Sequence, residues 1–414
     1  MEKFGKVIVK LRIPILILSF LLLIPSAIGY FNTRVNYDIL YYLPNEIETM
    51  QGQDILMDDF NKGAYAMVVV QNMDTKSTDR LIKKVENVDH VAQVISYTGI
   101  VGEDVPSEIV PSKFRKYFEN DSTDTTLFAI FFDNTTSSDD TMNAIIQIRE
   151  QTEGQAFISG MSAVVTDTKN LSEKETPLYV LIAVVLVCIV LAIFMDSFLV
   201  PVFFMISIGM AIVYNLGSNI LLGEVSYITK ALAAVLQLGV TLDYSIFLWH
   251  SYKEMKEIYP DDHKEAMAVA ISNTLTSVVG SSITTVAGFI ALCFMSFTLG
   301  LDLGVVMAKG VVFGVIGCVT ILPAMILAMD KWIEKKRHKA IIPDLGRIGG
   351  FVTKHYWIFI ILFLVIIGPA FYGQNHNQVY YDLMGTLPDN LESVKAGNAL
   401  ENDFDMGATH VILA

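Results

Sequence analysis

The sequence predicts a polytopic α-helical membrane protein with one α/β domain outside the membrane and the start of a second, parallel copy of the same unit. Seven apolar runs are each close to or above the roughly 20 residues that a bilayer demands. A polar block separates the first run from the other six. Residues 35–70 also match residues 379–414 at a constant offset of 344, with 11 of 36 aligned pairs identical.

Composition supports this fold class. Of the 414 residues, 53% are hydrophobic and only 17% are charged. The formal charge of −14 arises mainly in the polar block 33–176, so we expect no nucleic-acid partner. The three cysteines all fall in apolar runs and provide neither a disulfide framework nor a metal site. We expect no cofactor.

The first apolar run, Ile13–Phe31, follows a short basic N-terminus. A second copy of this region lies deep in the chain, where no signal peptide can be, so we assign residues 1–32 to a cytoplasmic N-terminus and an uncleaved first helix. The remaining runs predict helices 2–6 within 177–329, a basic linker at 330–355 and helix 7 at 356–375. These runs are Pro177–Met195, Phe198–Leu222, Tyr227–Trp249, Asn273–Phe297, Leu301–Met329 and Tyr356–Phe371.

Lysine and arginine show which loops face the cytoplasm. They gather in the N-terminus, in the predicted loop His250–Ser272 and in the linker 330–355, and are missing from the alternate short loops. By the positive-inside rule these basic segments are cytoplasmic. The polar block 33–176 is therefore predicted to be extracytoplasmic, and the protein to reside in the cytoplasmic membrane.

The extracytoplasmic block shows alternating strand and helix patterns. Residue alternation and β-branched content predict four strands, at Ala64–Gln71, His90–Tyr97, Thr125–Phe132 and Gln155–Ser159. Helical periodicity predicts Ser77–Val88 and Ser138–Gln151, with Pro106–Phe118 as a weaker helix. The order strand, helix, strand, strand, helix, strand predicts a ferredoxin-like unit.

The repeat is parallel, because six helices separate its copies and both therefore begin on the cytoplasmic side. Identities fall at turn formers, among them Leu43-Pro44 and its copy Leu387-Pro388. The segment 376–414 is expected to be the truncated start of a second extracytoplasmic domain, ending in a strand at Val411–Ala414. Since a lone strand has no sheet to join, we favour a piece of a longer protein over a naturally shortened product.

The fourth helix carries an aspartate, Asp243, well inside its apolar run, within Gly239-Val-Thr-Leu-Asp243-Tyr244. A charge at this depth costs roughly 2.5–3.5 kcal/mol on insertion scales, so such residues usually have a task. A carboxylate shielded from water can gain and lose a proton near neutral pH, because burial disfavours its charged form. We favour proton carrying over a purely structural hydrogen bond.

Other polar residues of the membrane helices are candidates to support Asp243. Gln237, Thr241 and Tyr244 share one helical face, and Asp243 stands about 100° from Tyr244. The fifth helix is rich in small and hydroxyl residues, which serve either close packing or a hydrated path. Lys309 lies two turns after Asp302, so it forms a local pair or acts as a counter-charge. The support set is Lys309, Gln237, Thr241, Ser277 and Ser281.

This architecture resembles the RND superfamily of proton-driven exporters, and within it the MMPL-type transporters. The resemblance rests on Gly239-x-x-x-Asp243-Tyr244, on Asp38 with Leu43-Pro44, and on Leu322-Pro323-Ala324. It implies a secondary active transporter of a bacterial membrane rather than an enzyme. Such a transporter exports lipids or drugs, with protons as the coupling ion and a proton relay through Asp243 and Tyr244. The implied partners are membrane lipids, a hydrophobic or amphiphilic substrate and the second half of the transporter, whose tenth helix these 414 residues lack. The oligomeric state stays open.

Three other functions compete with export. An intramembrane aspartyl protease needs two facing aspartates, and the chain has one deep aspartate and no Gly-x-Gly-Asp. A protein-export accessory of the same superfamily is disfavoured by the Asp-Tyr pattern and the single α/β block. A sterol-sensing or receptor-like protein that binds lipid without pumping stays open as the alternative, because a sensor can keep the same fold.

Overall fold

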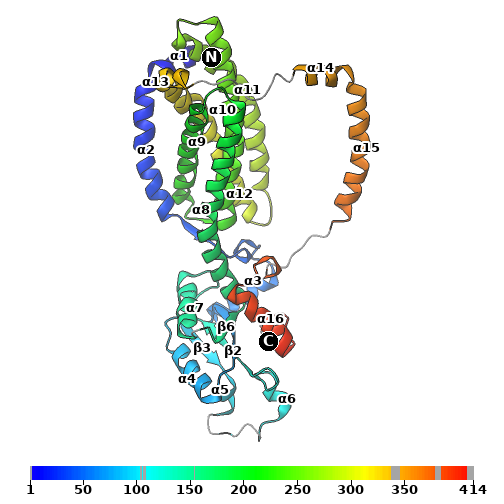
Figure 1. Ribbon diagram of the computed structural model, residues 1–414. Helices are drawn as coiled ribbons and strands as arrows, with labels where there is room; N and C mark the ends of the chain where they lie inside the picture. Colours follow the sequence, from blue (N-terminus) through cyan, green and yellow to red (C-terminus); the bar gives the residue numbers. More distant parts are fainter. Residues whose placement is uncertain are drawn as a thin grey trace.

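The computed structural model describes residues 2–102, 105, 109–152, 154–336, 346–377 and 384–407 (Figure 1). Within them, seven helices are long and apolar enough to cross a membrane, which confirms the polytopic α-helical class. They are α2 (Arg12–Asn32), α8 (Met161–Phe194), α9 (Leu199–Gly217) with η3 (Ser218–Leu222), α10 (Tyr227–Ile258), α11 (His263–Leu292), α12 (Leu299–Ile316) continued by η4 (Gly317–Ile321) and α13 (Leu322–Lys335), and α15 (Tyr356–Asn375).

Six of these spans form a bundle with α9 and α12 at its centre. The most apolar stretches of α9 and of α12–α13 are 56% and 61% buried, against 11% for α2 and 6% for α8, which therefore lie at the periphery. Large side chains that are fully buried, such as Phe204, Leu248 and Met267, fill the space between the helices. The short helix α1 (Glu2–Lys10) packs against α11, where Gly5 meets the backbone of Ala268.

Several helix boundaries differ from the sequence-based expectation, among them the end of α10, which runs on to Ile258 instead of Trp249. Helix α8 begins at Met161, although the second helix was expected from Pro177, because its first turns pack on the α/β domain and bury residues 162–167. Helix α11 begins at His263, so most of the predicted loop His250–Ser272 is helical. Asp262 caps α11 by accepting hydrogen bonds from the backbone nitrogens of Lys264 and Glu265, at 3.1 and 3.0 Å.

The α/β domain is built on a sheet whose strand order is β3-β5-β2-β6, with antiparallel neighbours. Strands β2 (Ala64–Gln71) and β5 (Thr125–Phe132) have the predicted bounds, while β3 (Val91–Ile95) and β6 (Ala156–Ser159) are shorter. A two-residue strand, β4 (Glu119–Asn120), pairs with β5. Helices α4 (Thr75–Glu86) and α7 (Asp139–Thr152) cover one face of the sheet through a common apolar core.

Shorter elements complete this half of the chain. Of the weaker predicted helix Pro106–Phe118, only α6 (Ser112–Arg115) is helical, and residues 106–108 lie outside the described residues; α5 (Tyr97–Val101) precedes it. The strand β1 (Arg34–Asn36) pairs in parallel with β7 (Glu224–Ser226), which joins the segment after α2 to the segment before α10. The turn η1 (Leu40–Tyr42) and α3 (Glu48–Asp58) follow β1.

The internal repeat is visible in the structure. Helix α14 (Gly346–Lys354), α15, the turn η5 (Met384–Thr386) and α16 (Glu392–Phe404) begin at 346, 356, 384 and 392. Each start lies 344 residues after that of α1, α2, η1 and α3, so the offset holds for every element of the second copy that is described. Tyr381, Asp382 and the expected strand Val411–Ala414 lie outside the described residues, as do linker residues 337–345.

The second copy is placed differently from the first. Helix α15 runs apart from the bundle with all its described side chains unburied, whereas α16 packs on the first α/β domain (Figure 1). Leu400 of α16 joins Val69 and Leu127 on the sheet face opposite α4 and α7. Helix α16 thus covers the second face of a sheet that belongs to the first copy.

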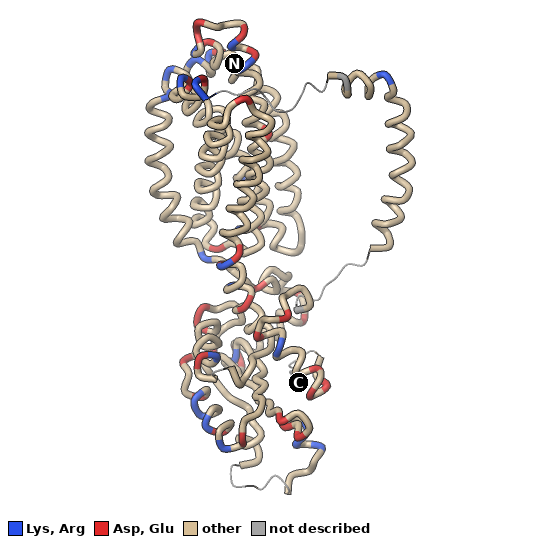
Figure 2. Tube along the Cα trace, in the orientation of Figure 1, with Lys and Arg blue, Asp and Glu red and all other residues tan. Residues whose placement is uncertain are grey.

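Charge separates the two ends of the molecule. Lysine and arginine gather around α1, the turn between α10 and α11, and the end of α13, while the middle of the bundle is nearly free of charge (Figure 2). The α/β domain lies at the opposite end of the bundle (Figure 1). The described basic segments therefore share one end of the bundle, and the described part of the acidic block 33–176 lies at the other.

Candidate functional site

Helix α10 presents two different faces at the Asp-Tyr pair. Its start is capped by Ser226, whose Oγ accepts a hydrogen bond from the backbone nitrogen of Ile228 at 3.2 Å. Tyr244 and Thr241 are buried, with 4% and 2% of their surfaces exposed, whereas the Asp243 side chain is exposed. The 100° step between neighbouring helix residues produces this division, because it turns Tyr244 toward the core and Asp243 toward the bundle surface.

Asp243 and Tyr244 line a cavity of about 350 Å³ between α10 and α11. From α11, Ser277, Ser281 and Thr285 contribute hydroxyl groups to the same cavity. Thr285 donates to the backbone oxygen of Ser281 at 3.1 Å. Within the described part of the chain, the side chains of Asp243, Tyr244, Ser277 and Ser281 have no hydrogen bond or ion pair. These groups are therefore available to water and to a proton.

The structure brings four predicted residues together here, namely Asp243, Tyr244, Ser277 and Ser281. Thr285 also lines this cavity, although the sequence analysis did not select it. It lies one turn beyond Ser281, so the i, i+4 spacing on a helix was the signal that could have selected it.

Gln237 and Thr241 lie in a different interface, between α10, α9 and α12. The Gln237 Oε1 atom accepts a hydrogen bond from Asn215 Nδ2 of α9 at 3.0 Å. A Cβ added at Gly310 would stand 2.6 Å from that Asn215 nitrogen, and one at Gly314 would stand 2.3 Å from Thr241 Oγ1. These two glycines let α12 approach α10 closely. Asn215, one of two amides in the largely apolar run Phe198–Leu222, is a buried polar residue that the sequence analysis missed.

Lys309 is separate from both groups. Its ammonium donates to Asn219 Oδ1 at 2.5 Å, while Asp302 accepts from the Ser226 nitrogen at 2.8 Å and from Thr229 Oγ1 at 2.5 Å. The described residues contain no ion pair between Lys309 and Asp302, so the alternative of a local pair is wrong. The two residues are seven apart on one helix, but each finds a nearer partner on a neighbouring element.

An ionic cluster ties α10, α11 and α13 together at the basic end of the bundle. Lys256 Nζ lies 3.3 Å from Asp330 Oδ1 and 2.6 Å from Glu334 Oε1, and His263 contacts Asp330 through Nδ1. The Tyr252 hydroxyl donates to Asp330 at 3.1 Å. His263, Asp330 and Glu334 could offer metal ligands. However, the Lys256 ammonium already supplies a cation to both carboxylates, so we assign this cluster a structural role.

Comparison with known proteins identifies a family and several membrane-protein relatives. The model of the MMPL family matches residues 42–357, which is more than half of the chain. The membrane protein MJ1562 of Methanocaldococcus jannaschii is 24% identical over 375 residues, covering 81% of this chain and 94% of that protein. MmpL12 of Mycobacterium tuberculosis, described as a probable transport protein, is 24% identical over 262 residues, covering 61% of this chain and 22% of MmpL12.

The apo-petrobactin exporter of Bacillus anthracis is 20% identical over 325 residues, covering 75% of this chain and 42% of the exporter. This chain therefore spans nearly all of the archaeal relative but less than half of the two transport proteins. The matched family segment contains most of the α/β domain, the five bundle spans from α8 to α13 and the Asp243-Tyr244 pair. From this match, we conclude that the chain belongs to the MMPL family.

Proposed function

We propose that this chain is part of a proton-coupled exporter that moves hydrophobic or amphiphilic molecules, lipids or drugs, out of the cytoplasmic membrane of a bacterium. The observation that carries the proposal is the cavity between α10 and α11. There, Asp243 sits near the middle of a 32-residue helix beside two serine hydroxyls that have no partner in the described chain. A carboxylate in this position can bind a proton and release it, which a permanently charged guanidinium could not do.

The energy available is sufficient for such a cycle. One proton that crosses a membrane potential of 100 mV releases about 2.3 kcal/mol, which corresponds to a roughly fiftyfold shift between two conformations. The names of two relatives, a probable transport protein and an exporter, support movement of a substrate. The protein is then a secondary active transporter rather than an enzyme.

The relay is proposed to be completed by a second half. Next to Asp243 of α10, the helix α11 has exposed small and polar residues at membrane depth, namely Ser277, Gly280, Ser281 and Thr284. A Cβ added at Gly280 would meet no atom within 4 Å. Polar side chains at this depth favour contact with protein or water over lipid tails. We propose that the second copy of the unit covers this surface and carries its own Asp-Tyr pair near position 587, which is 344 residues beyond Asp243.

We further propose that the N-terminus faces the cytoplasm and that the α/β domain is extracytoplasmic and ferredoxin-like. The clustering of lysine and arginine at the end that holds α1 supports this orientation. The sheet order β3-β5-β2-β6 with two helices on one face supports the assignment of the domain.

The test uses the full-length protein in sealed vesicles with a pH gradient and a fluorescent amphiphile as the probe. Asp243→Asn should reduce export to the level of vesicles without a gradient, because Asn fills the same volume but cannot carry the proton. Tyr244→Phe should reduce export less, since it deletes one hydroxyl and leaves the titrating group.

Glu257→Gln is the matched control, because it removes an exposed carboxylate from the same helix outside the cavity. It should transport like the wild type. Export at the wild-type rate by a correctly inserted Asp243→Asn protein would contradict the proposal. That result would favour the alternative of a protein that binds lipid without pumping.

A further inference from the structure

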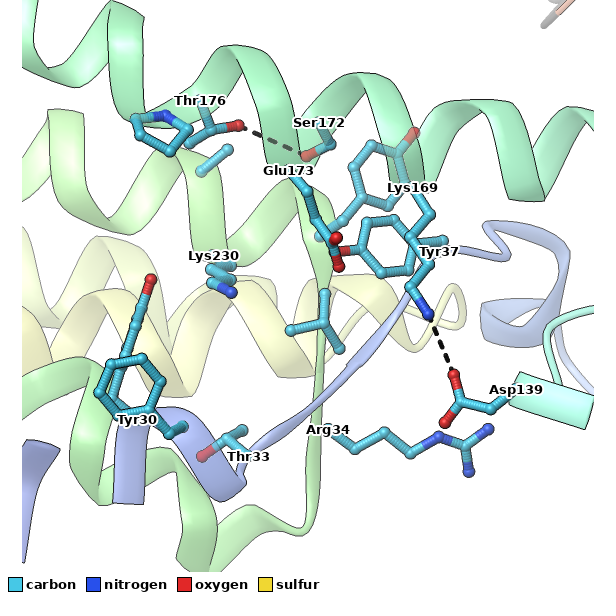
Figure 3. A pocket seen from close by; sticks show the side chains of 15 residues that line it. Tyr30, Thr33, Arg34, Tyr37, Asp139, Lys169, Ser172, Glu173, Thr176 and Lys230 are labelled. Carbon is cyan, nitrogen blue, oxygen red and sulfur yellow. Dashed lines mark hydrogen bonds and ion pairs between the residues drawn. The ribbon is translucent and has the colours of Figure 1, made fainter. Parts of the chain in front are cut away.

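A second cavity lies where the membrane helices meet the α/β domain, and Figure 3 shows its lining. It measures about 560 Å³ and forms where α2 ends, where α8 passes from the α/β domain into the bundle, and where α10 begins. Tyr30 of α2, Arg34 of β1, Lys169 of α8 and Lys230 of α10 point side chains into it from these four elements. The cavity is therefore at the depth of lipid headgroups if α2 and α10 span the bilayer.

The charges around this cavity are not balanced one for one. Lys169 Nζ lies 3.1 Å from Asp139 Oδ1. Arg34 has Glu224 at 3.9 Å, a distance that leaves most of its hydrogen-bonding capacity unused. Lys230 has no carboxylate within ion-pair distance in the described part of the chain. Its ammonium instead lies 5.0 Å from the centre of the Tyr30 ring.

One acidic side chain of the lining also has a partner. Glu173 accepts a hydrogen bond from the Tyr37 hydroxyl at 3.4 Å (Figure 3). Burial of Tyr37 raises the pKa of its phenol, so the hydroxyl keeps its proton and remains a donor. The Tyr37 ring in turn stacks on Tyr227 with centroids 5.6 Å apart, which fixes this wall. Among the three cations of the described lining, Lys230 is therefore the one without a carboxylate at ion-pair distance, while Glu173 has a neutral hydroxyl as its partner.

Exposed apolar side chains lie in the cavity lining and next to it. Phe31, which lines the cavity, is 82% exposed, and Leu178 and Tyr179 of α8, just past the lining residue Pro177, are 55% and 60% exposed. An ammonium held against an aromatic ring at the edge of such a surface fits a molecule that has an anionic head and apolar chains. A free anion would gain nothing from the exposed apolar side chains.

We propose that this cavity binds the phosphate-containing headgroup of an anionic membrane lipid, with Lys230 as the main contact, Tyr30 as the residue that positions it, and the acyl chains against Phe31 and Leu178. The site would receive an amphiphile from the leaflet on the side of the α/β domain. This inference rests on the proposed export function for its purpose, so its test measures binding and does not depend on transport.

The test titrates the detergent-solubilised full-length protein with phosphatidylglycerol and counts bound lipids by native mass spectrometry. The wild type should bind phosphatidylglycerol about tenfold more tightly than phosphatidylcholine, and Lys230→Gln should remove this preference, since one charge-assisted hydrogen bond is worth about a factor of ten or more. Lys230→Arg should retain the preference. Lys174→Gln, which removes an exposed cation of α8 outside the lining, is the matched control and should bind like the wild type.

Unchanged phosphatidylglycerol affinity in Lys230→Gln would overturn the proposal. Glycerol phosphate that competes as well as the lipid would also overturn it, because the ligand would then be a soluble anion. If Lys230→Gln fails to insert, Tyr30→Leu provides a second variant and should weaken binding about twofold to fivefold. Asp243→Asn should bind phosphatidylglycerol normally, so loss of export and loss of lipid binding are separable results.

Discussion

Helices α2 and α9 approach so closely that their contact includes backbone atoms. Substitution of the glycines at this contact tests how the two helices pack. A Cβ added at Gly217 would stand 2.0 Å from the backbone oxygen of Ser26, and one at Gly29 would stand 2.1 Å from the oxygen of Gly217. Ordinary contact begins at 3.4 Å, so Gly217→Ala requires the helices to separate by about 1.4 Å. Because a backbone oxygen cannot rotate away, we expect a cost of about 2 kcal/mol, within the usual range for overpacking.

Gly209→Ala is the matched control in the same helix. A Cβ there meets no atom within 4 Å, so the substitution should stabilise α9 by roughly 0.5–1 kcal/mol through helix propensity alone. The measurement is reversible unfolding of the purified protein in mixed micelles with increasing dodecyl sulfate, followed by circular dichroism. Two identical substitutions in one helix should therefore shift stability in opposite directions. Equal stability of the two variants would refute the close approach of α2 to α9.

Three further predictions follow from other contacts. Arg149→Ala should lower the free energy of unfolding of the α/β domain by about 3–5 kcal/mol, measured by thermal unfolding, because Asp167, which Arg149 contacts at 2.6 and 3.1 Å, would stay buried without a cation. Arg115→Ala removes an exposed ion pair with Asp121 and should lower it by less than about 1 kcal/mol. Equal losses of stability in the two variants would contradict this prediction. Gly314→Ala should lower the melting temperature, because the new Cβ would clash with Thr241 Oγ1. Adding Thr241→Ala to this variant should restore the melting temperature, and additive effects of the two substitutions would count against the contact. Burial raises the pKa of Asp38 above its ordinary value, so the folded state keeps this proton longer than the unfolded state and loses stability as pH rises from about 4. Asp38→Asn should therefore raise the melting temperature more at pH 7 than at pH 4, and an equal rise at both would be inconsistent with a raised pKa.

The sequence predicted those elements whose local pattern agrees with their tertiary surroundings. Strands β2 and β5 have the predicted bounds because each is a compact run of β-branched and aromatic residues ended by turn formers. The start of α8 could not be predicted in this way. Its first turns mix apolar residues such as Val164 and Val165 with polar ones, and Asp167 is held there by Arg149 of α7, a contact between residues 18 apart.

The candidate site was partly predictable from local patterns. Asp243 is conspicuous because it interrupts an apolar run, and the next helix along the chain, which is rich in hydroxyl residues, is expected to pack beside it. Which hydroxyls face Asp243 depends on the turn between α10 and α11, which spans only 259–262 once both helices are extended. The partners of Lys309 and Gln237 could not be predicted, because Asn219 and Asn215 belong to α9 and its extension, and the pairing depends on how three helices are rotated.

The position of α16 ties the two copies of the repeat together. Helix α16 is fixed to the first α/β domain through Leu400, through the Glu392 contact with Arg149 at 2.8 Å, and through the Ser393 nitrogen, which donates to Asp167 at 3.0 Å. The same chain continues backward from α16 into α15, a membrane span of the second copy. Helix α16, which belongs to the second copy by its place in the chain, is thus held by the domain of the first copy through both polar and apolar contacts.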